Sequence, residues 1–162
     1  MKIAFIQTGG TIDKDYPHSM KGWAFEIGEP AFRSILNNAQ QLHEISFHEI
    51  CRKDSLELNS EDRSQLKNLC QQLEEQHIII THGSDTLLKT AAALNSIQNK
   101  TIILTASMLP EKFKDSDASF NLGMAVAGAQ RLNSGIYVAI HGYLALWNKF
   151  TRDMQTGRYS LK

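Results

Sequence analysis

The chain has 162 residues, of which 42% are apolar, and this fits one ordinary globular domain with a real core. Its 17 basic and 17 acidic residues cancel, so no net charge indicates nucleic acid or an anionic membrane as a partner. The two cysteines form no metal-binding or disulfide pattern, and the apolar run at the N-terminus is too short for a signal peptide or a membrane span. We therefore expect a soluble, cytoplasmic protein with no metal and no cofactor.

Short apolar runs alternate with longer amphipathic ones along the chain. In the first half the pattern predicts a strand over residues 3–6, an irregular excursion over residues 13–29 that would form a mobile lid, a helix over residues 30–38, a strand over residues 44–51 and a helix over residues 60–76. The last helix starts with Ser60, and Arg63 stands three residues later, so we expect no full capping box.

The second half predicts strands over residues 77–81, 101–105 and 136–140, and helices over residues 86–95 and 118–132. Strands that are apolar on both faces and separated by helices are typical of a mostly parallel sheet covered on two sides. We therefore expect one α/β domain over residues 1–162, doubly wound and Rossmann-like. In such sheets ligands bind at the carboxyl ends of the strands. This rule directs attention to residues 8–13, 81–86 and 106–116.

The first of these segments reads Thr-Gly-Gly-Thr-Ile at residues 8–12, directly after the first strand. The two glycines let the backbone turn sharply and approach a ligand closely, and they present Thr11 at the strand edge. A glycine pair after a strand is also typical of a plain turn. The fingerprint of dinucleotide binding is absent, because no third glycine follows.

The second segment reads Thr-His-Gly-Ser-Asp-Thr at residues 81–86 and joins a strand to a helix. Ser84 or Asp85 could simply cap that helix, yet the turn has more polar residues than one cap requires. If the two turns meet, a hydroxyl nucleophile, a second hydroxyl and a carboxylate share one crevice. That is the composition of a nucleophilic acyl-transfer site.

Both motifs resemble the signature motifs of the bacterial-type L-asparaginase/glutaminase family, whose second motif usually reads Thr-His-Gly-Thr-Asp-Thr. Asp54-Ser55 resembles the family's substrate-binding serine loop, and residues 106–110 with 116–122 resemble its third strand-loop-helix unit. The resemblance covers essentially the whole chain, but only the amino-terminal domain of the usual two-domain enzyme. It implies a short amidohydrolase that converts L-asparagine, or a related small β-amide, to L-aspartate and ammonia.

The resemblance also implies a role for each matching position. Thr11 would attack the side-chain amide carbon and form an acyl-enzyme, and Tyr16 would be the lid tyrosine that orients or activates it. Ser84 would supply the second hydroxyl and position a water, and Asp85 would bind the substrate α-amino group. The substrate-binding positions would be Gly10, Ser55, Gly83 and Ala106, with Ser55 holding the α-carboxylate and the backbone amides near Gly83 helping it and stabilising the oxyanion.

Three positions depart from the family pattern. The family's catalytic lysine ends the stretch Asp-Val-Thr-Lys, and the matching residues 149–152 read Lys-Phe-Thr-Arg, which places Arg152 at that position. A guanidinium can hold Asp85, but it cannot act as a base because it keeps its proton. Leu56 stands where a polar substrate contact is common, and Ser84 replaces threonine. The alternative function is therefore a weak or inactive asparaginase-like domain that binds amino acids.

Expected partners follow from the same reasoning. The substrate would be a small amino-acid amide, and the resemblance implies a homodimer or larger oligomer, because family members complete their pockets with a neighbour. The six histidines are scattered, which favours structural roles over a metal site. Nucleotide binding is disfavoured, since the chain has no third glycine, no acidic ribose partner at the expected distance and no P-loop lysine.

Overall fold

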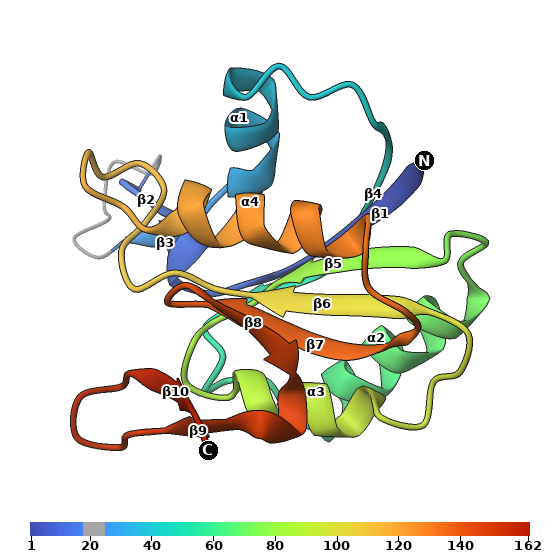
Figure 1. Cartoon of the computed structure of the whole chain (residues 1–162). Helices are drawn as coiled ribbons and strands as arrows, with labels where there is room; N and C mark the ends of the chain where they lie inside the picture. Colours follow the sequence, from blue (N-terminus) through green and yellow to red (C-terminus); the bar gives the residue numbers. More distant parts are fainter. Residues whose placement is uncertain (18–24) are drawn as a thin grey trace.

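The structure, a computed structural model, describes residues 1–17 and 25–162 and is built around a six-stranded sheet in the order β4-β1-β5-β6-β7-β8 (Figure 1). In chain order its strands are β1 (Lys2–Gly9), β4 (Glu44–Lys53), β5 (His77–Thr81), β6 (Thr101–Thr105), β7 (Gly135–Ile140) and β8 (Tyr143–Leu146). Strands β4, β1, β5, β6 and β7 run parallel, and β8 is antiparallel to β7. The predicted mostly parallel sheet is confirmed.

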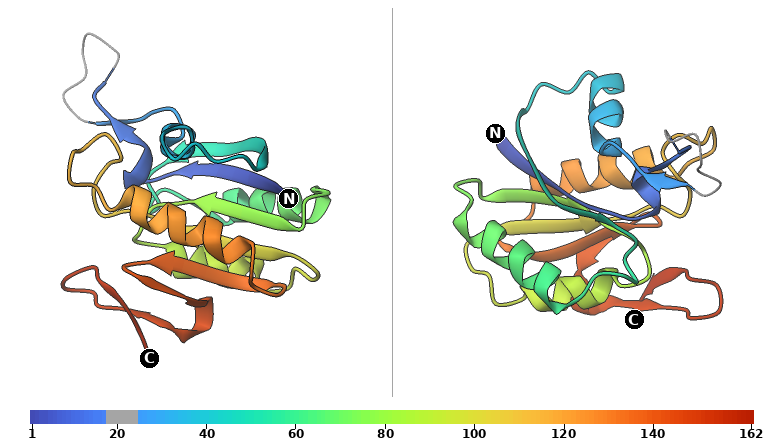
Figure 2. Two further views of the ribbon diagram at one scale, coloured as in Figure 1. Left: turned by 45° about the horizontal axis from the view of Figure 1, so that its top comes forward. Right: turned by 180° about the vertical axis from the view of Figure 1, so that it is seen from behind.

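Helices cover both faces of this sheet, as Figures 1 and 2 show. The helices are α1 (Ala31–Asn38), α2 (Ser60–Gln72), α3 (Leu87–Leu94) and α4 (Ala118–Ala129). One core cluster joins α2 and α3 to the sheet, and the other joins α1 and α4 to the opposite face. Together these layers confirm the doubly wound α/β fold.

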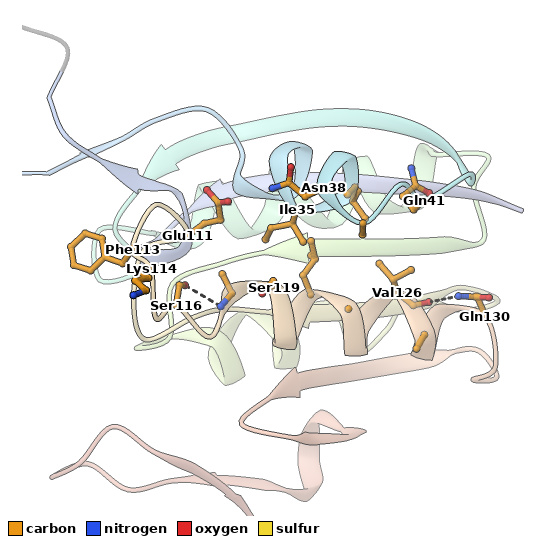
Figure 3. Close-up of a pocket in the computed structure, with 16 residues that line it drawn as sticks. Ile35, Asn38, Gln41, Glu111, Phe113, Lys114, Ser116, Ser119, Val126 and Gln130 are labelled. Carbon is orange, nitrogen blue, oxygen red and sulfur yellow. Dashed lines mark hydrogen bonds between the residues drawn. The ribbon is translucent and has the colours of Figure 1, made fainter.

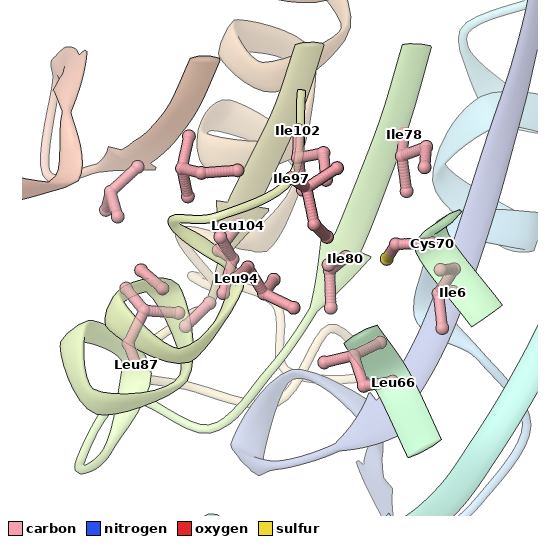
Figure 4. Close-up of a cluster of buried hydrophobic side chains, with 14 of the residues drawn as sticks. Ile6, Leu66, Cys70, Ile78, Ile80, Leu87, Leu94, Ile97, Ile102 and Leu104 are labelled. Carbon is pink, nitrogen blue, oxygen red and sulfur yellow. The ribbon is translucent and has the colours of Figure 1, made fainter. Parts of the chain in front are cut away.

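The isoleucine-rich strands explain why both faces need a cover. Successive side chains of a strand point to opposite faces, so Ile78 and Ile80 belong to the α2–α3 cluster (Figure 4). Ile79, which lies between them, belongs to the α1–α4 cluster. All three are fully buried. Burying an isoleucine side chain contributes roughly 1.5–3 kcal/mol, so each face gains stability only when a helix covers it.

Helix boundaries correct the expectations in detail. Asn59, not Ser60, is the N-cap of α2: its side chain accepts from the Asp62 N–H at 3.0 Å, and the Asp62 carboxylate accepts from the Asn59 N–H at 3.0 Å. A capping box is therefore present. The expectation that there is no capping box was wrong, because the N-cap stands one residue before Ser60. Helix α3 has Thr86 at its N-cap, so neither Ser84 nor Asp85 caps it. The predicted strands over 77–81 and 101–105 agree with β5 and β6 to the residue.

The short elements outside the main alternation were not predicted. They are η1 (Thr11–Asp13), β2 (Lys14–Asp15), β3 (Glu26–Ile27), η2 (Trp147–Lys149), β9 (Phe150–Arg152) and β10 (Tyr159–Leu161). Strands β2 and β3 pair antiparallel, as do β9 and β10, and each pair is too short to give an apolar period. The predicted irregular excursion thus has a paired base, while its central residues 18–24, the core of the expected lid, lie outside the described residues.

The fold places the chemistry-bearing turns at one edge. The turns after β1, β5 and β6 all follow the carboxyl ends of parallel strands, and the β2–β3 pair and the β9–β10 hairpin lie at the same end of the molecule (Figure 1). This is the edge where doubly wound sheets bind ligands. Among the described helices, none is long and apolar enough to span a bilayer.

Candidate active site

The turns after β1 and β5 touch through their glycines. Gly10 has φ 91°, in the left-handed region that favours glycine. A Cβ on Gly10 would lie 2.3 Å from the nitrogen of Gly83, and a Cβ on Gly83 would lie 2.6 Å from the Cβ of Ser55. Both positions therefore require glycine, and three backbone segments pack directly on one another. The two sequence motifs meet in space, together with the serine loop.

Two hydroxyls lie beside this glycine contact. Thr11 follows Gly10 at the start of η1 and is partly buried, while Ser84 follows Gly83 and is 9% exposed. Neither side-chain hydroxyl has a hydrogen-bond partner among the described residues, and the backbone N–H groups of residues 83–85 have no acceptor there either. These groups therefore have unused hydrogen-bonding capacity.

Asp85 and Arg152 form an ion pair at the same edge. The guanidinium of Arg152 donates to the Asp85 carboxylate at 2.6 Å. Arg152 comes from β9, so the C-terminal hairpin supplies the cation to the turn that follows β5. The sequence expectation that Arg152 holds Asp85 is confirmed by this contact.

Tyr159 ties the same hairpin to the second motif. Its hydroxyl donates to the carbonyl oxygen of Ser84, and its N–H donates to Nδ1 of His141 at 3.2 Å. Tyr159 is 3% exposed, and burial raises the pKa of its phenol to about 12. The phenol therefore stays protonated and acts as a donor. Sequence reasoning missed this residue, because nothing local relates it to a turn 75 positions earlier.

Ser55 lies against Gly83, and its hydroxyl oxygen already has a hydrogen-bond donor, so its substrate-binding role stays a prediction. The side chain is 1% exposed and accepts weakly from the N–H of Thr86 at 3.4 Å, and the Thr86 hydroxyl donates to the Ser55 carbonyl at 2.7 Å. Arg63 donates to the Thr86 hydroxyl at 3.0 Å and holds this arrangement from α2. The turn that carries Ser84 and Asp85 is therefore anchored on two sides.

The buried ring of His82 holds the backbone of the second motif. It is fully buried: its Nδ1 lies 2.7 Å from the Gly83 carbonyl and its Nε2 lies 2.8 Å from the Thr90 hydroxyl. Burial lowers the pKa of His82 to about 4, so the ring is neutral at pH 7. The carbonyl can only accept, which assigns the proton to Nδ1. His82 is thus a structural histidine, as expected.

The third unit is held by the side chains of Asn121 on α4 and of Asp117, the N-cap residue of α4. Ala106 is fully buried, and its carbonyl accepts from the Asn121 amide at 3.0 Å. Asp117 accepts from the N–H groups of Met108 and Leu109 at 2.9 and 3.2 Å. These bonds fix the course of the loop after β6, and the substrate-binding role of Ala106 stays a prediction.

Tyr16 is not seated in the site. Its side chain is 74% exposed, and its ring packs on Phe25 at 5.3 Å, which in turn contacts Phe113 of the β6–α4 loop at 5.6 Å. The proposed role of Tyr16 as the lid tyrosine stays a prediction.

A cleft lies beside the site, and a second cavity lies elsewhere in the fold. A cleft of about 550 Å³, which includes Met108, His141, Arg158 and Tyr159 in its lining, borders the hairpin beside the site. Another cavity of about 560 Å³ lies between α1 and α4, where Figure 3 shows Ile35 and Val126 on its two sides, and none of the predicted site residues lines it. Over residues 1–17 and 25–162 no cluster of three or more His, Cys, Asp or Glu side chains is placed to hold a metal.

Comparisons with known proteins agree with this geometry. A family model described as "Asparaginase, N-terminal" matches residues 2–159. An L-asparaginase of Thermococcus kodakarensis is 30% identical over 163 residues, which cover 97% of this chain and 49% of that protein. A glutaminase-asparaginase of Pseudomonas fluorescens biotype A is 28% identical over 136 residues, which cover 78% of this chain and 38% of the other.

A solved structure gives the same result in three dimensions. The thermostable L-asparaginase from Thermococcus kodakarensis superposes with a TM-score of 0.84 at 28% identity, and the match covers 99% of this chain and 51% of that one. The chain thus spans about half the length of the proteins that it resembles.

Proposed function

The chain belongs to the asparaginase family, and we propose that it is an amidohydrolase that converts L-asparagine, or a related small β-amide, to L-aspartate and ammonia. The observation that carries this proposal is the packing of Gly10 on Gly83. It brings the Thr11 turn onto the turn of Ser84 and Asp85, where two unpartnered hydroxyls and a carboxylate paired with a fixed cation gather at the ligand-binding edge.

In the proposed reaction the Thr11 oxygen attacks the side-chain amide carbon. The carbonyl oxygen becomes an oxyanion, which the unpartnered N–H groups near Gly83 stabilise by roughly 3 kcal/mol per donor. The C–N bond then breaks, ammonia leaves with the proton that Thr11 gave up, and an ester remains on Thr11. A water positioned by Ser84 hydrolyses this ester and restores the hydroxyl.

Charged groups would orient the substrate. Asp85 binds the α-ammonium group, and Ser55 with the nearby amides faces the α-carboxylate. Arg152 stabilises the Asp85 carboxylate but cannot accept the Thr11 proton, because a guanidinium keeps its own. In this proposal Tyr16 orients or activates Thr11, and its ring would have to leave Phe25 to do so.

The test is ammonia release from asparagine, glutamine and other β-amides by the purified chain. We expect turnover by the wild type and a loss of at least about 10³-fold in Thr11→Ala, because the acyl-enzyme can no longer form. Ser119→Ala, which removes an exposed hydroxyl on α4, is the matched control and should keep full activity. Equal background release by wild type and Thr11→Ala from every amide would contradict the proposal.

The identity of residue 152 favours a second candidate, an amino-acid-binding domain without turnover. A guanidinium locked on Asp85 keeps the charge pattern of a binding site and removes a lysine that could exchange a proton. Calorimetry separates the two functions: binding of aspartate or asparagine with no ammonia release supports the second one. Absence of binding to both amino acids rules it out.

We also propose that the chain works as a homodimer or larger oligomer, because members of the family that it resembles complete their pockets with a neighbouring subunit and Asp85 is exposed at the edge of the site. Light scattering at micromolar concentration tests this. A strict monomer contradicts it.

A further inference from the structure

Asp13 is a buried carboxylate at the end of the turn that carries Thr11. It is 3% exposed and has no role in the proposed chemistry. One carboxylate oxygen accepts from the N–H of Ala31 at 2.8 Å, and the other accepts from the side-chain amide of Gln7 at 3.0 Å. None of the ion pairs among the described residues includes Asp13. A carboxylate is thus buried against two neutral donors.

These bonds join four separate parts of the chain. Gln7 belongs to β1, Asp13 ends η1, and Ala31 is the first residue of α1, whose N-cap Pro30 offers no side-chain cap. Asp13 therefore caps α1 from 18 positions away. The fourth part is the end of the excursion, because the Asp13 carbonyl accepts from the N–H of Gly28 at 2.8 Å.

Gln7 strengthens the same junction from β1. The amide nitrogen that donates to Asp13 also donates to the carbonyl of Gly28 at 3.0 Å. Both ends of the excursion, β2 and β3, are thus fixed to the Thr11 turn by one cluster, which consists of Gln7, Asp13, Gly28 and Ala31. We call it the Asp13 clamp.

The clamp matches the ionised form of the carboxyl group. Each oxygen of Asp13 accepts from one N–H donor, and a proton on the carboxyl group weakens these bonds because a neutral carboxyl oxygen is a poorer acceptor than a carboxylate oxygen. The Gln7 amide cannot turn over to accept that proton without presenting its own oxygen to the Gly28 carbonyl. Protonation therefore loosens the clamp.

The surroundings bring this protonation into the neutral range. Burial raises the pKa of Asp13 to about 7, although the bonds from Ala31 and Gln7 oppose the rise. Arg52 on β4 also lowers it, but its guanidinium is shared with Glu29 and Glu49, and Glu111 of the β6–α4 loop raises it. The other charged groups that share a small cavity of about 210 Å³ with Asp13 are Lys14, Asp15, Glu29 and Lys112.

We propose that Asp13 is a positioning residue for Thr11, which its ionised carboxylate holds in place through the clamp and which its protonation releases. This inference rests on the proposed function for its catalytic consequence. An ionised buried carboxylate without a cation opposes folding. If Asp13 served only to stabilise the fold, a neutral side chain would do so better. The presence of a carboxylate therefore favours a positioning role.

Nuclear magnetic resonance tests the clamp without any turnover. The carboxyl carbon of Asp13 in the full chain should titrate with a midpoint near pH 7, and the amide signals of Thr11, Gly28 and Ala31 should shift with the same midpoint. In Asp13→Asn these amide shifts should disappear, while the control Glu74→Gln, an exposed surface change, should leave them intact. Titration of Asp13 below pH 5, or a flat Thr11 signal, overturns the inference.

The catalytic consequence of the clamp is tested by the pH dependence of kcat and KM. Wild-type kcat should fall tenfold per pH unit below about pH 7 with little change in KM, because the nucleophile and not the substrate is displaced. Asp13→Asn should lose this limb and show a kcat about tenfold lower at pH 8. Gln7→Leu removes a donor that lowers the pKa of Asp13, so its limb should move to higher pH. An unchanged limb in both variants overturns the inference.

The two arms also separate this inference from the proposed function. If the wild type releases no ammonia from any amide while Thr11 follows the titration of Asp13, the proposed function fails and the clamp stands.

Discussion

The guanidinium of Arg152 donates a 2.6 Å hydrogen bond to the carboxylate of Asp85, which precedes it by 67 positions. The Arg152 side chain is 15% exposed and that of Asp85 is 39% exposed, so the cation is the more enclosed partner. A group that the family resemblance expects to exchange a proton is here a permanent charge. Turnover by this chain therefore requires a site that works with an arginine in place of the family's lysine.

Arg152→Lys should raise turnover if the remainder of the site is competent. An ammonium beside Asp85 keeps the charge and can exchange a proton, and we expect kcat to rise about tenfold or more, within the usual 10²–10⁴-fold range of general acid–base effects. The measurement is steady-state ammonia release from asparagine. Arg158→Lys, on the exposed part of the hairpin, is the matched control, and equal rates in wild type and Arg152→Lys would count against a catalytic site at this edge.

Gly10→Ala should unfold or strongly destabilise the chain. Its Cβ would lie 2.3 Å from the Gly83 nitrogen at a φ of 91°, so both steric overlap and backbone strain oppose it, together at least about 3 kcal/mol. Gly123→Ala is the control: its Cβ meets nothing within 4 Å on an exposed face of α4, and it should stabilise the chain by up to about 1 kcal/mol. Urea unfolding of both variants checks this, and equal effects would refute the packing of Gly10 on Gly83.

His82 should make folding stability fall in mild acid. Its pKa is about 4 in the folded chain and about 6.5 when unfolded, so the stabilising contribution is complete above about pH 6.5. It is lost as the pH falls through about 4, by roughly 3 kcal/mol in total. Asp13 acts in the opposite direction, because its raised pKa makes its own contribution fall as the pH rises through about 7.

The two contributions separate in a variant comparison. The unfolding free energy of His82→Asn minus that of wild type, measured from pH 7 to pH 4, should become about 3 kcal/mol more favourable to the variant. His43→Asn, at a partly exposed histidine, is the matched control. A constant difference for His82→Asn would mean that His82 takes up its proton in the folded state.

Tyr159→Phe should weaken the link between the hairpin and the second motif. It leaves the Ser84 carbonyl without its buried donor, which costs about 1–3 kcal/mol, and it should lower kcat because the Ser84 turn loses one of its anchors. Tyr143→Phe removes a hydroxyl from a side chain that is 41% exposed and should change neither quantity. Thermal unfolding and ammonia release test both variants. Equal thermal stability and equal ammonia release in the two variants would show that Tyr159 has no role in the site.

The fold could be predicted from the sequence because its central strands are continuous apolar runs. Strands β5 and β6 agree with expectation to the residue because four consecutive buried positions in β5 and five in β6, between polar turns, leave one register. The β9–β10 hairpin was missed because three-residue strands with one buried residue each carry no period. The capping box of α2 was missed because the N-cap stands one residue before the expected start, and boundaries are set by local hydrogen bonds that the apolar pattern does not encode.

By itself, the sequence determined the parallel α/β architecture and the turns that carry Thr11, Ser84 and Asp85, because periodicity and glycine placement are local properties of the chain. Only the tertiary structure decided that Gly10 packs on Gly83 and that Asp13 clamps the Thr11 turn to α1, and it supplied the contact of Arg152 with Asp85 that the family resemblance had led us to expect. These contacts join residues 18 to 73 positions apart, and one-dimensional spacing contains no information on them until sheet order and loop packing bring the segments together.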